Sequence, residues 1–132
     1  MVEVSDATSV QAGERFAAAL AGKQATVLAD LLAPDIDFRG LTPGRTWEAS
    51  SRANVLEILL SHWFAPTDVI EELLSVETSM IADRRHVSYR LRGHDPQGPF
   101  VVEQQMYFMT DDDQDRITWM RVLCSGFRTP TD

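Results

Sequence analysis

The sequence contains little cysteine, no long apolar run and too few basic residues to balance its acidic ones. Cys124 is the only cysteine among 132 residues, which excludes an internal disulfide and any thiolate-rich metal site. No stretch approaches the roughly 20 apolar residues that span a bilayer. The N-terminal segment MVEVSDATSV also lacks the positive and apolar regions of a secretion signal. We therefore expect a cytoplasmic protein.

The excess of acidic residues indicates which partners the protein is not expected to bind. With 12 basic and 20 acidic residues, the net charge of -8 repels nucleic acid and anionic membranes, so neither is expected as a partner. The acidic run from Asp111 to Asp115 does not fit a calcium loop, because Arg116 and Val122 stand where that loop requires glycine and glutamate. The GHDPQG segment lacks a phosphate-loop pattern. No metal and no cofactor are expected.

What the sequence does contain is enough apolar material for one core, since 44% of the residues are hydrophobic. We expect a single domain over residues 1–132. Thr8 and Gln11 have the spacing of a capping box, which predicts a helix over about 9–21 that ends before Gly22. A second, shorter helix ends before Pro34, and a third begins at Ser50 or Ser51 and ends before Pro66. The apolar positions of these two helices are Val27, Leu28, Leu31, Leu32, Val55, Leu56, Leu59, Leu60 and Trp63.

Extended structure is predicted between and after these helices. Residues 35–40 alternate between polar and apolar side chains, which favours a half-buried strand followed by the turn-rich LTPGRT. Four longer alternating runs follow, near 69–82, 86–94, 99–110 and 117–128, separated by turn residues. Helices first and a four-stranded meander afterwards indicate an α+β architecture, in which the helices cover the apolar face of the sheet.

Strand alternation also assigns a face to each side chain. The inward set is predicted to be Val76, Thr78, Met80, Val87, Tyr89, Leu91, Val102, Gln104, Met106, Phe108, Met120, Val122 and Cys124. The outward set carries charges of alternating sign on neighbouring strands, namely Glu77, Arg90, Arg92, Glu103 and Arg121. Tyr107, Trp119 and Leu123 share the outward face and are too apolar for a monomer's solvated surface, so we expect a two-fold dimer that buries them.

Four segments, in this order, resemble the nuclear transport factor 2-like, or SnoaL-like, superfamily: LLAPDIDFRG, PGRTWEA, ADRRHVSYRLRG and DDDQDRITWMRVLCSGF. The resemblance covers essentially the whole chain and is closest to uncharacterised bacterial members. It implies three N-terminal helices packed on a curved, mostly antiparallel sheet, with a cone-shaped pocket between them. It implies no defined substrate.

The resemblance also lets the superfamily's known chemistries be compared with this chain. The acidic and phenolic groups of ketosteroid isomerases align with Phe16, Gly40 and Met106, so all three functional groups are absent. Similar cyclases and epoxide hydrolases need inward carboxylates, and none occurs among the inward positions 120, 122 and 124. Dehydratases of this fold use paired pocket histidines, and no such pair is evident here.

What remains is an apolar pocket with a few polar groups. We expect its lining to contain Phe16, Phe38, Leu59, Trp63, Tyr89, Gln104, Met106, Met120 and Cys124. Gln104 could bind a ligand or make a structural hydrogen bond, Tyr89 and Cys124 could be plain core residues, and His62 could simply complement a helix dipole. Arg39, Arg45 and Trp47 flank the expected mouth and could clamp a ligand or simply pack there.

Three functions stay open at this point. The first is a domain that binds a small, largely apolar molecule. The second is an isomerase, cyclase or hydrolase that uses Tyr89, Gln104, His62 or an arginine as hydrogen-bond donors. The third is a protein-interaction module that uses the outer face of the sheet.

Overall fold

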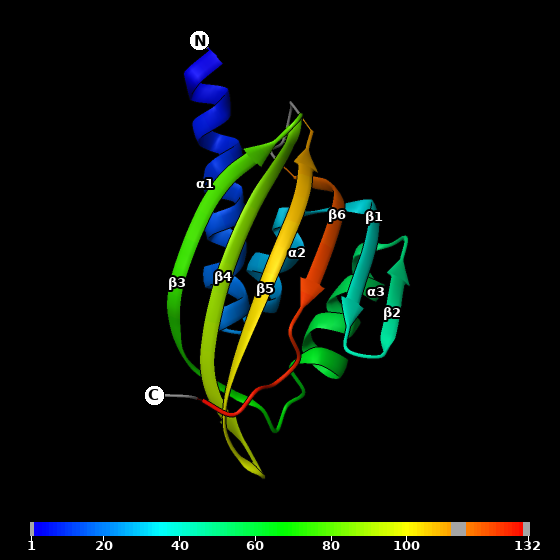
Figure 1. Cartoon of the computed structure of the whole chain (residues 1–132). Coiled ribbons are helices and arrows are strands. Elements are labelled where there is room, and N and C mark those ends of the chain that lie inside the picture. Colours follow the sequence, from blue (N-terminus) through cyan, green and yellow to red (C-terminus); the bar gives the residue numbers. More distant parts are fainter. Residues whose placement is uncertain (1, 112–115, 131–132) are drawn as a thin grey trace.

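The computed structural model describes residues 2–111 and 116–130, with side chains from residue 12 onward. Helices occupy the first half of the chain and one sheet dominates the second half (Figure 1). The helices are α1 (Val2–Ala21), α2 (Ala25–Leu31) and α3 (Arg52–Glu57), and α3 continues as a π-helix, η1 (Ile58–Trp63). The strands are β1 (Leu32–Thr42), β2 (Arg45–Ala49), β3 (Val69–Ile81), β4 (Arg84–Asp95), β5 (Gly98–Thr110) and β6 (Ile117–Cys124).

All three predicted helices are present, but two of their boundaries differ from the prediction. Helix α1 begins at Val2, so Thr8 lies inside the helix and is not its cap. Helix α2 ends at Leu31, and Leu32 and Pro34 belong to β1. Pro34 is tolerated there because it falls between Leu32 and Asp37, where the pairing with β6 shifts register and the ladder is interrupted. Ser51 is the cap of α3, since its hydroxyl accepts a hydrogen bond from the Asn54 amide at 3.3 Å.

The sheet has six strands in the order β2-β1-β6-β5-β4-β3, and only the β1–β6 pair is parallel. Strands β3 to β6 form the predicted meander, whereas the sequence analysis missed β2. Strand β2 pairs with β1 through a tight hairpin at Pro43 and Gly44, where Gly44 has a φ of +79° that favours glycine. The α+β class, with three helices on a mixed and mostly antiparallel sheet, is confirmed.

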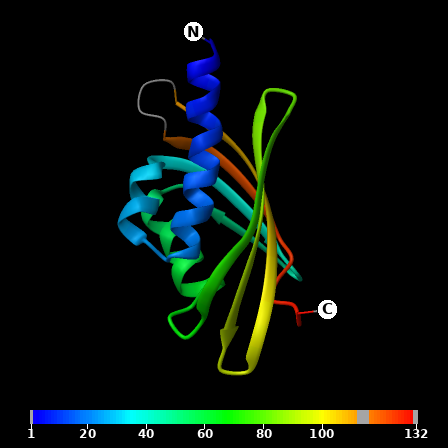
Figure 2. The same ribbon diagram turned by 90° about the vertical axis from the view of Figure 1, so that its left-hand side faces the viewer.

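The sheet bends around the helices, which all lie against one of its faces (Figure 2). On β4, β5 and β6 every side chain predicted to point inward is buried on this concave face. Met80 lies on the same face by register, because its partner Arg85 pairs with the buried Phe108, but Met80 is 52% exposed and forms no part of a pocket wall. It lies opposite Arg85 at the far end of the β3–β4 hairpin, where that hairpin extends away from the helices (Figure 2).

The convex face carries ion pairs between neighbouring strands, of which Arg90–Glu103 joins two residues of the predicted outward set. Arg90 and Glu103 lie opposite each other on β4 and β5 and form an ion pair at 3.6 Å. Arg92 pairs with Glu72 at 2.8 Å, and Arg121 pairs with Asp37 at 3.1 Å. Such exposed pairs each contribute about 1 kcal/mol or less. Among the described residues, no helix is both long and apolar enough to cross a membrane.

Candidate functional site

Three polar side chains form a row across the concave face. In the strand register Tyr89 of β4 lies opposite Gln104 of β5, and Gln104 lies opposite Cys124 of β6. Residues directly opposite each other on neighbouring strands point to the same face, so the three side chains are adjacent inside the fold. The row therefore follows from strand pairing alone.

Hydrogen bonds connect this row into a chain. The Tyr89 hydroxyl donates to Gln104 Oε1 at 2.5 Å, and Gln104 Nε2 donates to Cys124 Sγ at 3.2 Å. The amide of Gly126 donates to the same sulfur at 3.4 Å. Gln104 is fully buried, and both ends of its amide are paired. This satisfies the requirement that a buried amide find partners, so the hydrogen bonds of Gln104 serve the packed interior.

Burial also fixes the protonation state of the tyrosine. It raises the pKa of the Tyr89 phenol well above its ordinary value, and the neighbouring Cys124 raises that pKa further. Tyr89 is therefore neutral at physiological pH and acts as a donor to Gln104. The Phe16 ring of α1 lies 6.3 Å from the Tyr89 ring, so the helix covers this part of the row.

The nine residues predicted to line a pocket are all buried, with exposures between 0% and 7%. Eight of them belong to the hydrophobic core cluster, and Gln104 is a fully buried polar residue. Phe38 also borders a hollow of about 400 Å³ beside β1 and β2. Six of the nine line neither this hollow nor the three described below: Phe16, Leu59, Tyr89, Gln104, Met106 and Met120. Trp63 and Cys124 line an open cavity of about 300 Å³. That any of the nine binds a ligand stays a prediction.

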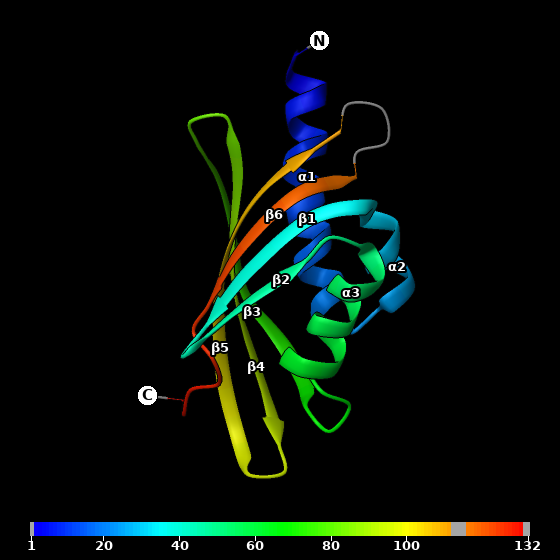
Figure 3. The same cartoon turned by 90° about the vertical axis from the view of Figure 1, so that its right-hand side faces the viewer.

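The cavity lies where β1 and β6 end. Because these two strands run parallel, their carboxyl ends, Thr42 and Cys124, meet at one end of the sheet (Figure 3). The end of η1 and the chain that follows β6 complete the wall. Besides Trp63 and Cys124, the lining consists of Thr42, Trp47, His62, Phe64, Asp68, Gly126 and Phe127.

Aromatic rings form most of this wall. Trp47 and Trp63 meet nearly edge to face, at 84° with 6.2 Å between centroids, so together they form a corner. His62 lies 5.4 Å from the Trp47 ring, and the Trp47 indole N–H donates to Thr42 Oγ1 at 2.8 Å. On the opposite side Phe127 stacks on Phe100 at 3.9 Å and lies 5.8 Å from Phe64.

Polar groups are few in the cavity. Asp68 is the only carboxylate in the lining, and its Oδ2 accepts a hydrogen bond from the Ala65 amide at 2.8 Å. The indole N–H of Trp63 is buried and has no hydrogen-bond partner in the described part of the chain. Cys124 Sγ accepts two hydrogen bonds, so its own S–H is left to point elsewhere. Asp68 is therefore the one anionic group in the lining, and the Trp63 N–H is buried behind the cavity surface.

Arg45 and Arg39, which the sequence places near the mouth, have different partners. The Arg45 guanidinium stacks over the Trp47 ring, 3.6 Å from its centroid. Arg39 pairs with Glu48 at 3.4 Å and lines a hollow on the convex face rather than this cavity.

Sequence reasoning missed several lining residues for identifiable reasons. Trp63 and His62 were both candidates from the sequence, whereas Phe64 was missed. Phe64 follows the π-helical turn of η1, where α-helical spacing no longer applies. Strand alternation beyond Cys124 would send Phe127 outward. Strand β6 instead ends at Cys124, and Gly126 turns the chain with a φ of +74°. Gly126 is therefore the feature of the sequence that could have indicated this turn.

The three positions that align with the ketosteroid isomerase groups lack those functional groups, and packed side chains also fill the space around them. Phe16 and Met106 are fully buried in the core. At Gly40 an added Cβ would lie 2.7 Å from Trp63 Cη2, so the indole occupies the space directly above the glycine. Trp63 thus fills the site at which that chemistry would place a base.

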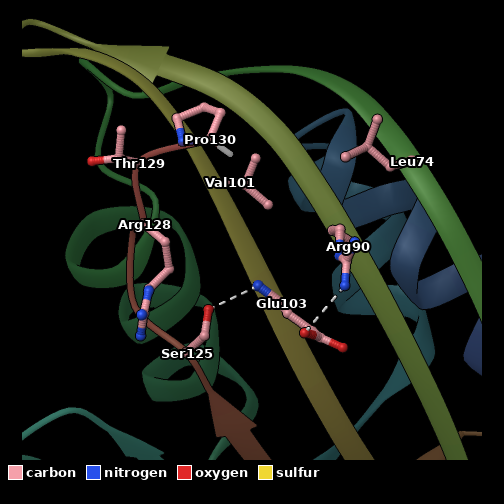
Figure 4. Close-up of a pocket in the computed structure, with 8 residues that line it drawn as sticks. All are labelled: Leu74, Arg90, Val101, Glu103, Ser125, Arg128, Thr129 and Pro130. Carbon is pink, nitrogen blue, oxygen red and sulfur yellow. Dashed lines mark hydrogen bonds and ion pairs between the residues drawn. The ribbon is translucent and has the colours of Figure 1, made fainter. Parts of the chain in front are cut away.

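Two further hollows lie on the convex face. One of about 440 Å³ is bounded by β4, β5 and the C-terminal tail (Figure 4). Its charges are largely paired among themselves, since Arg90 meets Glu103 and the Glu103 amide donates to Ser125 Oγ at 2.9 Å (Figure 4). The other, of about 380 Å³, is lined by apolar side chains that include Leu41, Tyr107 and Leu123.

No protein-family model matches the chain, and no curated protein matches its sequence. Solved structures do match. A proposed isomerase from Bacillus subtilis is 13% identical, with a TM-score of 0.76 over 92% of this chain and 88% of that one. A proposed polyketide cyclase from Xanthomonas campestris pv. campestris is 14% identical, with a TM-score of 0.70 over 90% of this chain and 91% of that one.

A third match is a protein from Catenulispora acidiphila with a ketosteroid isomerase-like fold, solved in complex with trimethylamine. It is 21% identical, with a TM-score of 0.62 over 85% of this chain and 83% of that chain. The chain has the nuclear transport factor 2-like fold. The fold that the sequence resemblance implied is thereby confirmed. Identities this low establish the fold alone, and that fold carries many functions.

Proposed function

We propose that this protein binds a small molecule in the cavity at the end of β1 and β6. The ligand would lie against the rings of Trp47, Trp63 and Phe127 and present one or two polar atoms to the groups between them. The binding residues would be those that line the cavity, of which Trp63 and Cys124 were also predicted from sequence.

One observation carries this proposal: a hollow of about 300 Å³ walled by aromatic side chains, with few polar groups converging on it. Ligand sites have this composition and about this size. The C. acidiphila neighbour, which holds trimethylamine, supports a small ligand on this fold.

Tryptophan fluorescence provides a direct test. Two of the three tryptophans, Trp47 and Trp63, line the cavity, and Trp119 lies on the convex face. A Trp119→Phe protein therefore reports on the cavity alone. We expect at least one fragment from a panel of neutral, anionic and cationic small molecules to change this fluorescence saturably.

The matched control for this test uses two exposed apolar residues. In the Trp119→Phe background Phe127→Ala should weaken the binding of such a fragment, because Phe127 forms part of the wall. Leu41→Ala, which removes an apolar side chain from the convex face, should leave it unchanged. Binding that is insensitive to Phe127, or a panel without any binder, would rule out the cavity.

Two residues named in the catalytic alternative, Tyr89 and Gln104, are poorly placed to act on a substrate. The hydroxyl of Tyr89 and the amide of Gln104 bind each other and lie in the packed core, so neither is free to polarise a substrate. His62 lines the cavity and is the remaining candidate for proton transfer. An isomerase, cyclase or hydrolase of this fold would therefore have to rely on His62 and Asp68. A cytoplasmic location stays a prediction.

We also propose that the convex face forms a homodimer interface. Leu123 is 54% exposed and Leu41 is 50% exposed, and both line the same apolar hollow beside Tyr107. Trp119 contributes less than expected, because Arg84 and Arg121 stack against its ring at 4.6 and 4.4 Å. The same face would serve the alternative role of binding another protein.

Light scattering tests the interface. We expect the protein to run as a dimer at micromolar concentration, and Leu123→Asp to make it a monomer without changing its far-UV circular dichroism. Glu77→Gln, also on the convex face, should leave the dimer intact because it adds no charge to the apolar hollow. A wild-type monomer at that concentration would contradict the proposal.

A further inference from the structure

We infer that the ligand of the cavity at the end of β1 and β6 is a small organic cation, such as a quaternary ammonium or protonated amine. This inference rests on the proposed function, because it names the chemical class that the same cavity would select. It is carried by the charge and the geometry of the lining.

The rings provide the first part of the argument. Aromatic faces carry negative electrostatic potential, so several rings around one space form a cage that favours a cation. Trp47 and Trp63 form a corner at 84°, and His62 and Phe64 lie beside them. The Arg45 guanidinium, 3.6 Å from the Trp47 centroid, already covers one face of that ring, so a ligand would have to use the other face.

Asp68 provides the second part. It is the only formally charged side chain in the lining. Within the described ranges its carboxylate has no ion pair, and only one oxygen, Oδ2, is engaged, by the Ala65 amide at 2.8 Å. An anion beside aromatic rings complements a cation and disfavours an anionic ligand. The net charge of -8 acts in the same direction over longer range.

One neighbouring cation partly opposes this charge. The Lys23 ammonium donates to the backbone carbonyl oxygens of Ala65 and Asp68, so it lies near Asp68 without bonding to the carboxylate. Burial lowers the pKa of Lys23, and the nearby Asp68 partly offsets that effect. Lys23 is not part of the lining, so a ligand would meet the carboxylate and the rings rather than the ammonium.

A matched pair of probes isolates the charge. Choline and 3,3-dimethylbutan-1-ol have almost the same shape, but only choline is a cation. In titrations of the Trp119→Phe protein we expect choline to bind about tenfold more tightly than the alcohol, the difference typical of a desolvated cation over aromatic rings. Equal affinities, or tighter binding of the alcohol, would overturn the cation inference and leave the proposed binding site standing.

Charge variants locate the effect. Asp68→Asn keeps an oxygen for the Ala65 amide and removes the charge, so it should lower choline affinity about tenfold and leave the alcohol unchanged. Asp35→Asn removes the same charge from an exposed position on β1 outside the lining and should change neither titration. Unchanged alcohol binding also shows that the Asp68→Asn cavity is folded.

The outcomes separate the two proposals. An equal loss of choline affinity in both variants would mean that overall charge, not the cavity, attracts the cation, and would overturn the inference. Binding of neutral fragments alone from the wider panel would overturn the cation class but not the site. No binding of any probe would remove both the cation inference and the proposed function.

Discussion

The concave face of the sheet is packed at its centre and open at one end, although strand alternation sends side chains inward in both places. At the centre Phe16 of α1 covers Tyr89, and the hydrogen bonds of the polar row are satisfied among its own members. At the open end β1 and β6 stop, and the wall is completed by Trp47 of β2, the end of η1, Asp68 and the C-terminal tail. Inward orientation therefore identifies a core position, whereas the ends of elements decide which part of that face a ligand can reach.

Truncating one ring in each region gives the largest expected contrast. Phe16→Ala removes a fully buried ring and should lower the free energy of unfolding by about 3–5 kcal/mol. Phe127 is 37% exposed, so Phe127→Ala should cost only about 1 kcal/mol while it alters the cavity. Urea denaturation followed by circular dichroism measures both. Similar losses for the two variants would mean that the open end is as tightly packed as the centre.

A smaller effect is expected inside the polar row. Tyr89→Phe leaves the buried Gln104 Oε1 without its donor, which should destabilise the protein by about 1–3 kcal/mol. The raised pKa of Tyr89 adds a pH signature. The pKa of Tyr89 in the folded protein lies above its unfolded value near 10. The contribution of the neutral phenol to the free energy of unfolding is therefore complete below about pH 10, and it is lost as pH rises above that value.

Urea denaturation at pH 8 and at pH 11 measures this signature. The stability difference between wild type and Tyr89→Phe should shrink at the higher pH, because only the wild type loses stabilisation there. Tyr107→Phe removes a phenol from the half-buried convex face and is the matched control. A constant difference for Tyr89→Phe at both pH values would show that the row does not depend on a neutral phenol.

The sequence predicted the row better than the cavity. Alternation on β4, β5 and β6 is regular, so the inward positions of Tyr89, Gln104 and Cys124 could be read directly. The hairpin that adds β2 was read as a turn, because RTWEA is too short for its alternation to stand out against the adjoining Pro43 and Gly44. Short strands depend on their neighbours for pairing, which a single sequence does not show.

The lining of the cavity was harder to predict, because much of it comes from irregular structure. The π-helical turn of η1 and the positive φ at Gly126 both interrupt the periodicity on which prediction rests. Asp68 enters the lining from the loop before β3, where no period applies. Each missed residue thus follows a break in regular structure. Of the nine residues predicted to line the pocket, the two that line the cavity, Trp63 and Cys124, are the last residues of their elements. Trp47 and His62, which also line the cavity, had been candidates from the sequence as well.

The C-terminal tail lines the cavity, but its side chains can change without disturbing the pairing of the strands. Arg128 exchanges backbone hydrogen bonds with Val101 at 2.8 Å, which hold the tail to β5 in addition to the stacking of Phe127 on Phe100. The side chain of Phe127 can therefore change size or polarity while strand pairing elsewhere is retained. Selection acting on this short segment could retune ligand preference while the scaffold stays constant, so close relatives that share the fold need not share a ligand.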